Sequence, residues 1–201
     1  HYGTYFVPNQ AYLVIVGDVT QEEADGWVKE HFLKWKKGGE AKQETYDVPT
    51  YVGNNVFFVD KPGAVQSRIT ITHNMELQPG HEDVIKLRVL NQVLGGGSFS
   101  ARLMSNLRED KAYTYGCYSN ISSDLIMGSF SAGGSFRNEV TDSSVTQFMV
   151  ELNRMIDEDV TEEQLQSVKN YMTGTFAYTL QDPQTIARFA INTEKYLLPD
   201  D

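Results

Sequence analysis

Two hydrogen-bond donors stand seven residues apart in the segment from Leu107 to Gly116, LREDKAYTYG. The segment is predicted to join the end of a helix to the start of a strand, which would place Arg108 and Tyr115 at the border of one cleft. A guanidinium and a phenol can both stabilise the oxyanion that forms when water attacks a peptide carbonyl, and one such donor is worth ~10²–10³ in rate. The same residues also allow a structural interpretation, in which Arg108 complements a helix C-terminus and Tyr115 favours a strand.

The four histidines do not form a zinc-site pattern. A zinc hydrolase needs two imidazoles that reach one ion, for example at positions i and i+4 of a helix with a glutamate between them. The nearest approach is HNMEL, where Leu77 stands in place of a second histidine after His73 and the segment is predicted to end a strand. His1, His31 and His81 are isolated. The sequence therefore predicts no metal site in this chain.

Two further motifs carry little chemistry. The run GGGS at 95–98 precedes a predicted helix, where free N–H groups can bind an anion, but no Gly-Lys-Ser/Thr follows and a corner between helices is favoured. Cys117 is the only cysteine, so no internal disulfide can form. No pattern supplies Cys117 with a base, and it is interpreted as a buried strand residue.

Composition predicts an ordinary globular chain. A length of 201 residues suits one well-cored domain, and the predicted domain is the whole range 1–201. Seventeen Lys and Arg against 27 Asp and Glu give a charge of -10, which argues against nucleic acid as a partner. That acidity suits neutral or basic peptides, although solvation alone explains the charge of most acidic proteins. No apolar run approaches the ~18 residues of a membrane helix.

The elements expected around these residues are strands in hairpin pairs and helices in blocks. Strands are predicted at 11–17, 56–59, 66–73, 113–121 and 127–136, with the second pairing with the third and the fourth with the fifth. Helices are predicted after the Thr20 cap to residue 35, at 84–94, 98–110 and 141–157, after the Thr161 cap, and at 183–197. A long connection is predicted over 36–54. This order predicts an α+β two-layer sandwich, a mostly antiparallel mixed sheet with helices packed on one face.

Several blocks occur along the chain in a specific order and spacing. They include AYLVIVGD at 11–18, DKPG at 60–63, NQVLGGGSF at 91–99 and LREDKAYTYG at 107–116, with Tyr5, Pro8-Asn9, Gln66, Arg102-Leu103 and Lys169 between and beyond them. In these blocks the chain resembles the insulinase/pitrilysin family of zinc metallopeptidases, which includes mitochondrial processing peptidase. The resemblance covers nearly all 201 residues. It implies the metallohydrolase half fold of the LuxS and processing-peptidase type, here as the C-terminal half-domain without a zinc motif.

The resemblance also implies a function. Family members close two homologous halves on a peptide: one half binds zinc through His-x-x-Glu-His, and the other contributes an Arg and a Tyr seven residues apart. Arg108 and Tyr115 match that pair, so both are predicted to be catalytic and substrate-binding residues. Tyr113, on the same predicted strand face, is predicted to support substrate binding. The implied protein is the substrate-binding half of a zinc-dependent endopeptidase, inactive alone.

The partners expected from the resemblance are a peptide substrate and a zinc-binding half, either upstream in the same protein or as a homologous subunit. Zinc is the implied cofactor of that partner half, and none is expected in this chain. An omitted upstream half is the favoured account, because residues 5–9 look like the entry that follows a first half. Lost catalysis in the parent protein is a third account, and a non-catalytic structural or binding subunit is the alternative function. The compartment stays open, with the bacterial periplasm or cell envelope expected if a missing N-terminus carries a signal.

Overall fold

The computed structural model describes residues 1–39 and 53–199. The chain forms two compact units, one made of His1–Asp47 with Gly174–Asp201 and the other of Val48–Thr173. The expectation of a single domain over residues 1–201 stays a prediction. Most of the long connection expected over 36–54 lies outside the described residues.

The described residues form mainly helices and one small sheet. The first unit contains α1 (Tyr2–Tyr5), η1 (Pro8–Gln10), α2 (Gln21–Phe32) and α6 (Pro183–Tyr196). The second contains β1 (Gln66–Met75), α3 (Val84–Leu94), η2 (Met104–Asp110), β2 (Cys117–Ser122), β3 (Gly128–Arg137), η3 (Asn138–Val140) and α4 (Thr141–Asp157). Helix α5 (Glu162–Thr179) includes residues of both units. The predicted bounds of α3 and α4 are confirmed.

Side chains at the helix starts explain where several helices begin. The Thr20 hydroxyl accepts from the Glu23 N–H, and the Glu23 carboxylate accepts from the Thr20 N–H, which is the predicted capping box of α2. Thr161 and Gln164 exchange the same pair of bonds at the start of α5. Because each exchange satisfies two backbone N–H donors that the helix itself leaves free, both starts are fixed locally.

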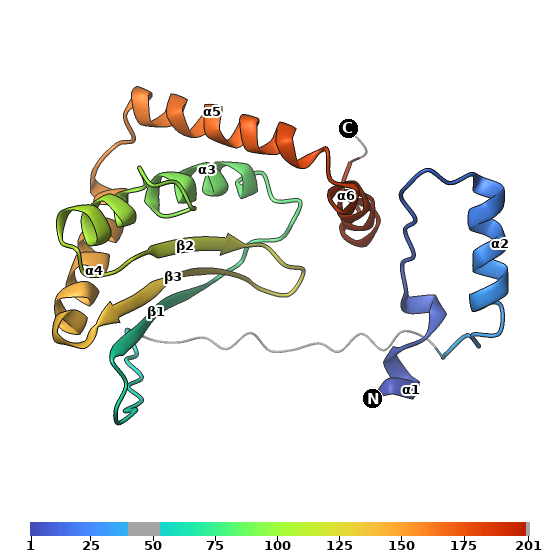
Figure 1. Cartoon of the computed structure of the whole chain (residues 1–201), viewed down its shortest axis with the longest axis horizontal. Helices are drawn as coiled ribbons and strands as arrows, with labels where there is room; N and C mark the ends of the chain where they lie inside the picture. Colours follow the sequence, from blue (N-terminus) through green and yellow to red (C-terminus); the bar gives the residue numbers. More distant parts are fainter. Residues whose placement is uncertain (40–52, 200–201) are drawn as a thin grey trace. The chain divides into compact units, whose positions relative to one another are not determined.

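The sheet is antiparallel throughout, with strand order β1-β3-β2 (Figure 1). The β2–β3 hairpin confirms the predicted pairing of the last two strands. Strand β1 begins at the predicted residue, Gln66, and extends two residues further than expected, to Met75. The predicted two-layer α+β architecture is confirmed, with three strands in the described part of the chain.

Two predicted strands are wrong. Residues 11–17 and 56–59 belong to no strand, and the apolar side chains of 56–59 are exposed, Val56 by 91%. The long strand β1 pairs with β3 and not with 56–59. An apolar run rich in β-formers becomes a strand only when its backbone groups meet a partner, and no ladder in the described residues includes either run.

The connection from α3 to β2 also differs from the prediction. The helix expected from residue 98 begins at Arg102, because the Ser98 hydroxyl and carbonyl accept from the N–H groups of Ser100 and Ala101 and so form a turn. From Met104 the helix has π geometry. The strand expected from Tyr113 begins at Cys117, because the Thr114 hydroxyl bonds the carbonyls of Gly116 and Ser135 in place of a regular backbone ladder.

The core of the second unit lies between one face of the sheet and its helices. Its members are apolar residues from all three strands and from α3, the helix at 102–110 and α4: Ile69, Leu94, Leu103, Met104, Leu107, Cys117, Ala132, Phe136 and Phe148. Phe136 of β3 and Phe148 of α4 meet edge to face with ring centroids 5.7 Å apart. This packing fixes one face of the sheet against helices and leaves the alternate residues of each strand on the other face.

Candidate functional site

A hollow of about 380 Å³ lies over the sheet face opposite the core. Because side chains alternate along a strand, Arg68 and Thr70 of β1 point to the opposite face from Ile69. Tyr118 and Asn120 of β2 likewise alternate with the buried Cys117 and Ser119. The hollow is therefore lined chiefly by polar side chains from all three strands.

The strand register arranges these side chains in rows across the sheet. Arg68 stands opposite Ser135, and Thr70 opposite Gly133, which in turn stands opposite Tyr118. A Cβ at Gly133 would contact the Ile69 carbonyl oxygen of β1 and lie 3.2 Å from the Thr70 Cα. Glycine at this position therefore permits the close approach of β1 and β3 and keeps the floor of the hollow free of a side chain.

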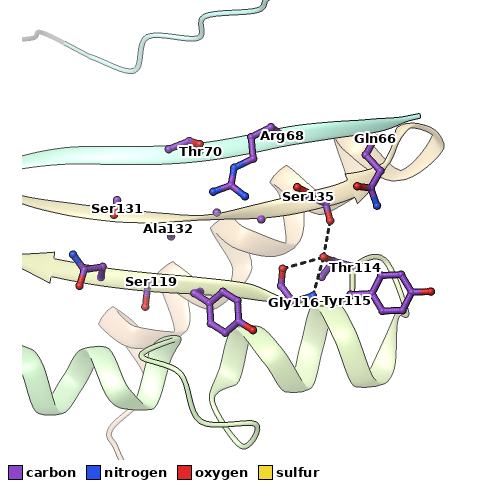
Figure 2. A pocket seen from close by; sticks show the side chains of 14 residues that line it. Gln66, Arg68, Thr70, Thr114, Tyr115, Gly116, Ser119, Ser131, Ala132 and Ser135 are labelled. Carbon is purple, nitrogen blue, oxygen red and sulfur yellow. Dashed lines mark hydrogen bonds between the residues drawn. The ribbon is translucent and has the colours of Figure 1, made fainter. Parts of the chain in front are cut away.

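Tyr115 lies at one end of the hollow, on the segment that leads into β2. The residue is 92% exposed, and Figure 2 shows its ring directed outward from the sheet. Thr114 anchors this segment, because its hydroxyl lies 2.6 Å from the Ser135 carbonyl oxygen and 3.0 Å from that of Gly116, and it accepts from the Gly116 N–H (Figure 2). A phenol is thus presented to solvent from an anchored backbone, as a donor to a bound molecule requires.

Arg108 lies in the last turn of η2 and does not line the hollow. Its side chain is 33% exposed, with Nε 3.4 Å from a Glu109 carboxylate oxygen. The guanidinium stacks over the Phe99 ring, 4.8 Å from the centroid. Stacking and ion pairing restrain the arginine without burying it, so it keeps donors for a ligand.

Tyr113 and Tyr115 have different environments. Tyr113 is half-buried and packs against the core cluster, and its N–H donates to the Leu107 carbonyl. The shared strand face expected for Tyr113 and Tyr115 is absent, because β2 begins only at Cys117. Cys117 itself is buried and donates to the Leu103 carbonyl at 3.3 Å, and burial raises the pKa of its thiol to about 12. A thiol in that state is not a nucleophile.

No group of three or more His, Cys, Asp or Glu side chains in the described residues is placed to hold a metal ion. His73 is an exposed residue of β1, and His81 lies near Asp83, 3.8 Å from its carboxylate. The described residues therefore do not fit a zinc site.

Residues 1–172 match the model of the family described as Peptidase M16 inactive domain. The chain belongs to this family. This membership agrees with the resemblance to zinc metallopeptidases found in the sequence.

Relatives of this M16 inactive domain are longer proteins. It is 28% identical over 197 residues to a Bacillus subtilis protein called "Uncharacterized zinc protease YmxG", covering 96% of this chain and 45% of the relative. This chain therefore spans less than half the length of that relative.

Solved structures share the fold. A peptidase M16 inactive domain from Pseudomonas fluorescens matches with a TM-score of 0.73 at 21% identity, over 92% of this chain and 43% of that one. A protease from Helicobacter pylori matches with a TM-score of 0.76 at 18% identity, over 95% of this chain and 46% of that one. The periplasmic protease PqqL of Escherichia coli matches with a TM-score of 0.66 at 14% identity, over 89% of this chain and 20% of that one.

Membrane-spanning helices are not found in the described part of the M16 inactive domain, where every helix is too short or too polar to cross a bilayer.

Sequence reasoning found Tyr115 but did not single out Arg68. The signal was present, because polar residues at 66, 68, 70 and 72 alternate with Ile69 and Ile71. That alternation predicts a polar strand face, but it does not identify the strands beside it. The hollow depends on β3 and β2 lying next to β1, and this arrangement does not follow from the alternation along one strand.

Proposed function

We propose that this chain is the substrate-binding half of a zinc-dependent endopeptidase, with Tyr115 as a donor to the scissile peptide carbonyl. The observation that carries the proposal is the exposure of Tyr115 at the end of a polar hollow, on a segment that Thr114 anchors. Membership of the M16 inactive-domain family supports a peptidase role for the parent protein.

The proposed division of labour follows from the chemistry of this chain. The other half, as part of the same polypeptide or as a separate subunit, would hold the zinc, which would supply an activated water. This half supplies uncharged and cationic donors that gain strength as negative charge develops on the carbonyl oxygen. Arg108 is the second proposed donor, restrained by Phe99 and Glu109.

Tyr113 has a supporting role in this proposal. Its ring packs against the core, and the Leu107 carbonyl accepts from its N–H, so it holds the segment that carries Tyr115. We therefore assign Tyr113 to substrate binding through the position of Tyr115. A residue that acts in this way sets the position of the Tyr115 phenol but donates no hydrogen bond to the reacting atoms itself.

The first prediction concerns Tyr115→Phe, measured in this chain produced together with its zinc-binding half. The substitution removes one hydroxyl and keeps the ring, so kcat for peptide cleavage should fall about a hundredfold while KM changes little. Arg108→Gln should also lower kcat.

Tyr171→Phe is the matched control, because Tyr171 is an exposed tyrosine of α5 that does not line the hollow. It should leave both kinetic constants unchanged. Full kcat in Tyr115→Phe would show that the phenol is not a donor in the reaction and would favour a structural or binding role for this half.

A further inference from the structure

Arg68 differs from most arginines of the second unit because its guanidinium has no hydrogen-bond or ion-pair partner among the residues that the structure describes. Within this unit Arg102, Arg108, Arg137 and Arg154 each lie within 4.0 Å of a carboxylate, at 3.9, 3.4, 3.1 and 3.0 Å. Among the described residues no hydrogen bond or ion pair satisfies the Arg68 side chain, which is exposed. Of the described residues that line the hollow, Arg68 is the only charged one. Its donors are therefore available to a bound molecule.

The surroundings of Arg68 leave room for an anion. Its cross-strand neighbour is Ser135, and the next row holds Thr70 and Gly133, so the residues beside it are small. Figure 2 shows the Arg68 side chain directed from β1 toward β3, over the floor of the hollow. The guanidinium presents several N–H groups in a plane, a geometry that matches the two oxygens of a carboxylate.

Arg68 and Tyr115 lie at opposite sides of the same end of the hollow. Arg68 is on β1, its partner Ser135 is on β3, and the Ser135 carbonyl accepts from Thr114, the residue before Tyr115. Neighbouring strands lie ~4.8 Å apart, so β1 and the segment leading into β2 are separated by ~10 Å. An extended peptide rises ~3.3 Å per residue, so this separation corresponds to about three residues.

We propose that Arg68 is a specificity-determining residue that binds the carboxylate of an Asp or Glu side chain within about three residues of the scissile bond. This inference rests on the function proposed above. The chain carries a net charge of -10, which disfavours strongly acidic peptides as a whole. The substrate expected is therefore a neutral or basic peptide with one acidic residue at a defined position.

The test compares three peptides that differ only at that position, Glu, Gln or Lys, each with an amidated C-terminus. With this chain and its zinc-binding half together, kcat/KM should favour Glu over Gln about fivefold, as expected for one partly exposed ion pair. Arg68→Gln should abolish the preference, and Arg68→Glu should shift it to the Lys peptide. Arg88→Gln, which removes an exposed arginine of α3 outside the hollow, should keep the preference of the wild type.

A binding measurement separates this inference from the proposed function. With zinc removed by a chelator, fluorescence anisotropy of the labelled Glu and Gln peptides reports affinity without cleavage. An Arg68-dependent preference in binding supports the inference even if Tyr115→Phe retains full kcat. Equal affinity for the two peptides, or a preference that survives Arg68→Gln in a variant with an unchanged melting temperature, overturns it.

The C-terminal carboxylate of a peptide is the other source of the same chemistry. A matched set of peptides with free C-termini distinguishes the two sources. If only these peptides gain affinity from Arg68, the residue recognises chain ends, and the proposed selection of an acidic side chain is wrong.

Discussion

Glu151 holds the most buried carboxylate in the part of the chain that the structure describes, with 1% of the residue exposed. It lies on α4 and accepts from the Arg154 guanidinium at 3.0 Å and from the Asn106 amide at 2.5 Å. Asn106 belongs to η2, the helix that carries Arg108. A buried carboxylate thus links the two helices and supports the placement of a proposed donor.

Glu151→Ala should lower the free energy of unfolding by about 2 kcal/mol, because it leaves the half-buried Asn106 and Arg154 groups without their shared acceptor. Urea denaturation followed by circular dichroism measures the change. Glu82→Gln, an exposed carboxylate near the start of α3, should stay within about 0.5 kcal/mol of the wild type. A similar loss in both variants would show that the Glu151 network contributes no specific stability.

At the residue scale, the sequence identified donors that local context makes recognisable. Tyr115 lies in the segment that joins a predicted helix to a predicted strand, and this context predicted a position at the border of a cleft. The different environments of Tyr113 and Tyr115 were not predictable, because they depend on the Tyr113 N–H bond to Leu107 and on the bond of the Thr114 hydroxyl to the Ser135 carbonyl. The stacking of Arg108 on Phe99 was not predictable either, because Phe99 lies in a turn where the sequence predicted a helix.

At the scale of elements, helices were predictable and strands less so. The bounds of α3 and α4 follow from the 3.6-residue period and nearby breakers, which are local properties. The run VFFV at 56–59 has the composition of a strand, but no strand in the described part of the chain pairs with it. Strand pairing depends on residues far apart in sequence, so β1 and β3 could each be recognised as strands while their pairing with one another could not.

Two glycine substitutions test the elements that carry the hollow. Gly133→Ala should destabilise the chain by about 2 kcal/mol, because its Cβ would meet the backbone of β1 and force the strands apart. Gly26→Ala should stabilise it by about 0.7 kcal/mol, because Gly26 lies inside α2 with nothing within 4 Å of an added Cβ.

Thermal unfolding of both glycine variants measures these opposite changes in stability. Gly133→Ala should also weaken the Arg68-dependent preference for the Glu peptide, since the floor of the hollow shifts. If Gly133→Ala leaves stability unchanged, β1 and β3 do not approach as closely as their register indicates.

At the scale of the whole molecule, the sheet has two chemically different faces. One face carries Phe136, Ile69 and Cys117 into the core, and the other carries Arg68 and Tyr118 toward solvent. The polar face lines the hollow, and it is the surface that we propose for the substrate. The packing of the other face against the helices keeps the strands, and with them the side chains of the polar face, in position.

This arrangement makes Cys117 a reporter of how firmly the second unit stays closed. It is the only cysteine, it is fully buried, and burial raises the pKa of its thiol from 9.0 to about 12. Because the folded pKa is raised, the neutral thiol's contribution to stability is complete below about pH 9 and is lost as the pH rises toward 12. Below pH 9, alkylation therefore requires opening of the unit.

Iodoacetamide labelling at pH 8, followed by mass spectrometry, should be at least about 10³-fold slower in the native chain than in urea, since opening of a stable core costs several kcal/mol. The control is Ser143→Cys in a Cys117→Ala background, which places a thiol on the exposed side of α4 and should react at the rate of the unfolded chain. Rapid labelling of native Cys117 would mean that β2 separates readily from the helices. The segment that carries Tyr115 would then be too mobile to orient a donor at the scissile bond.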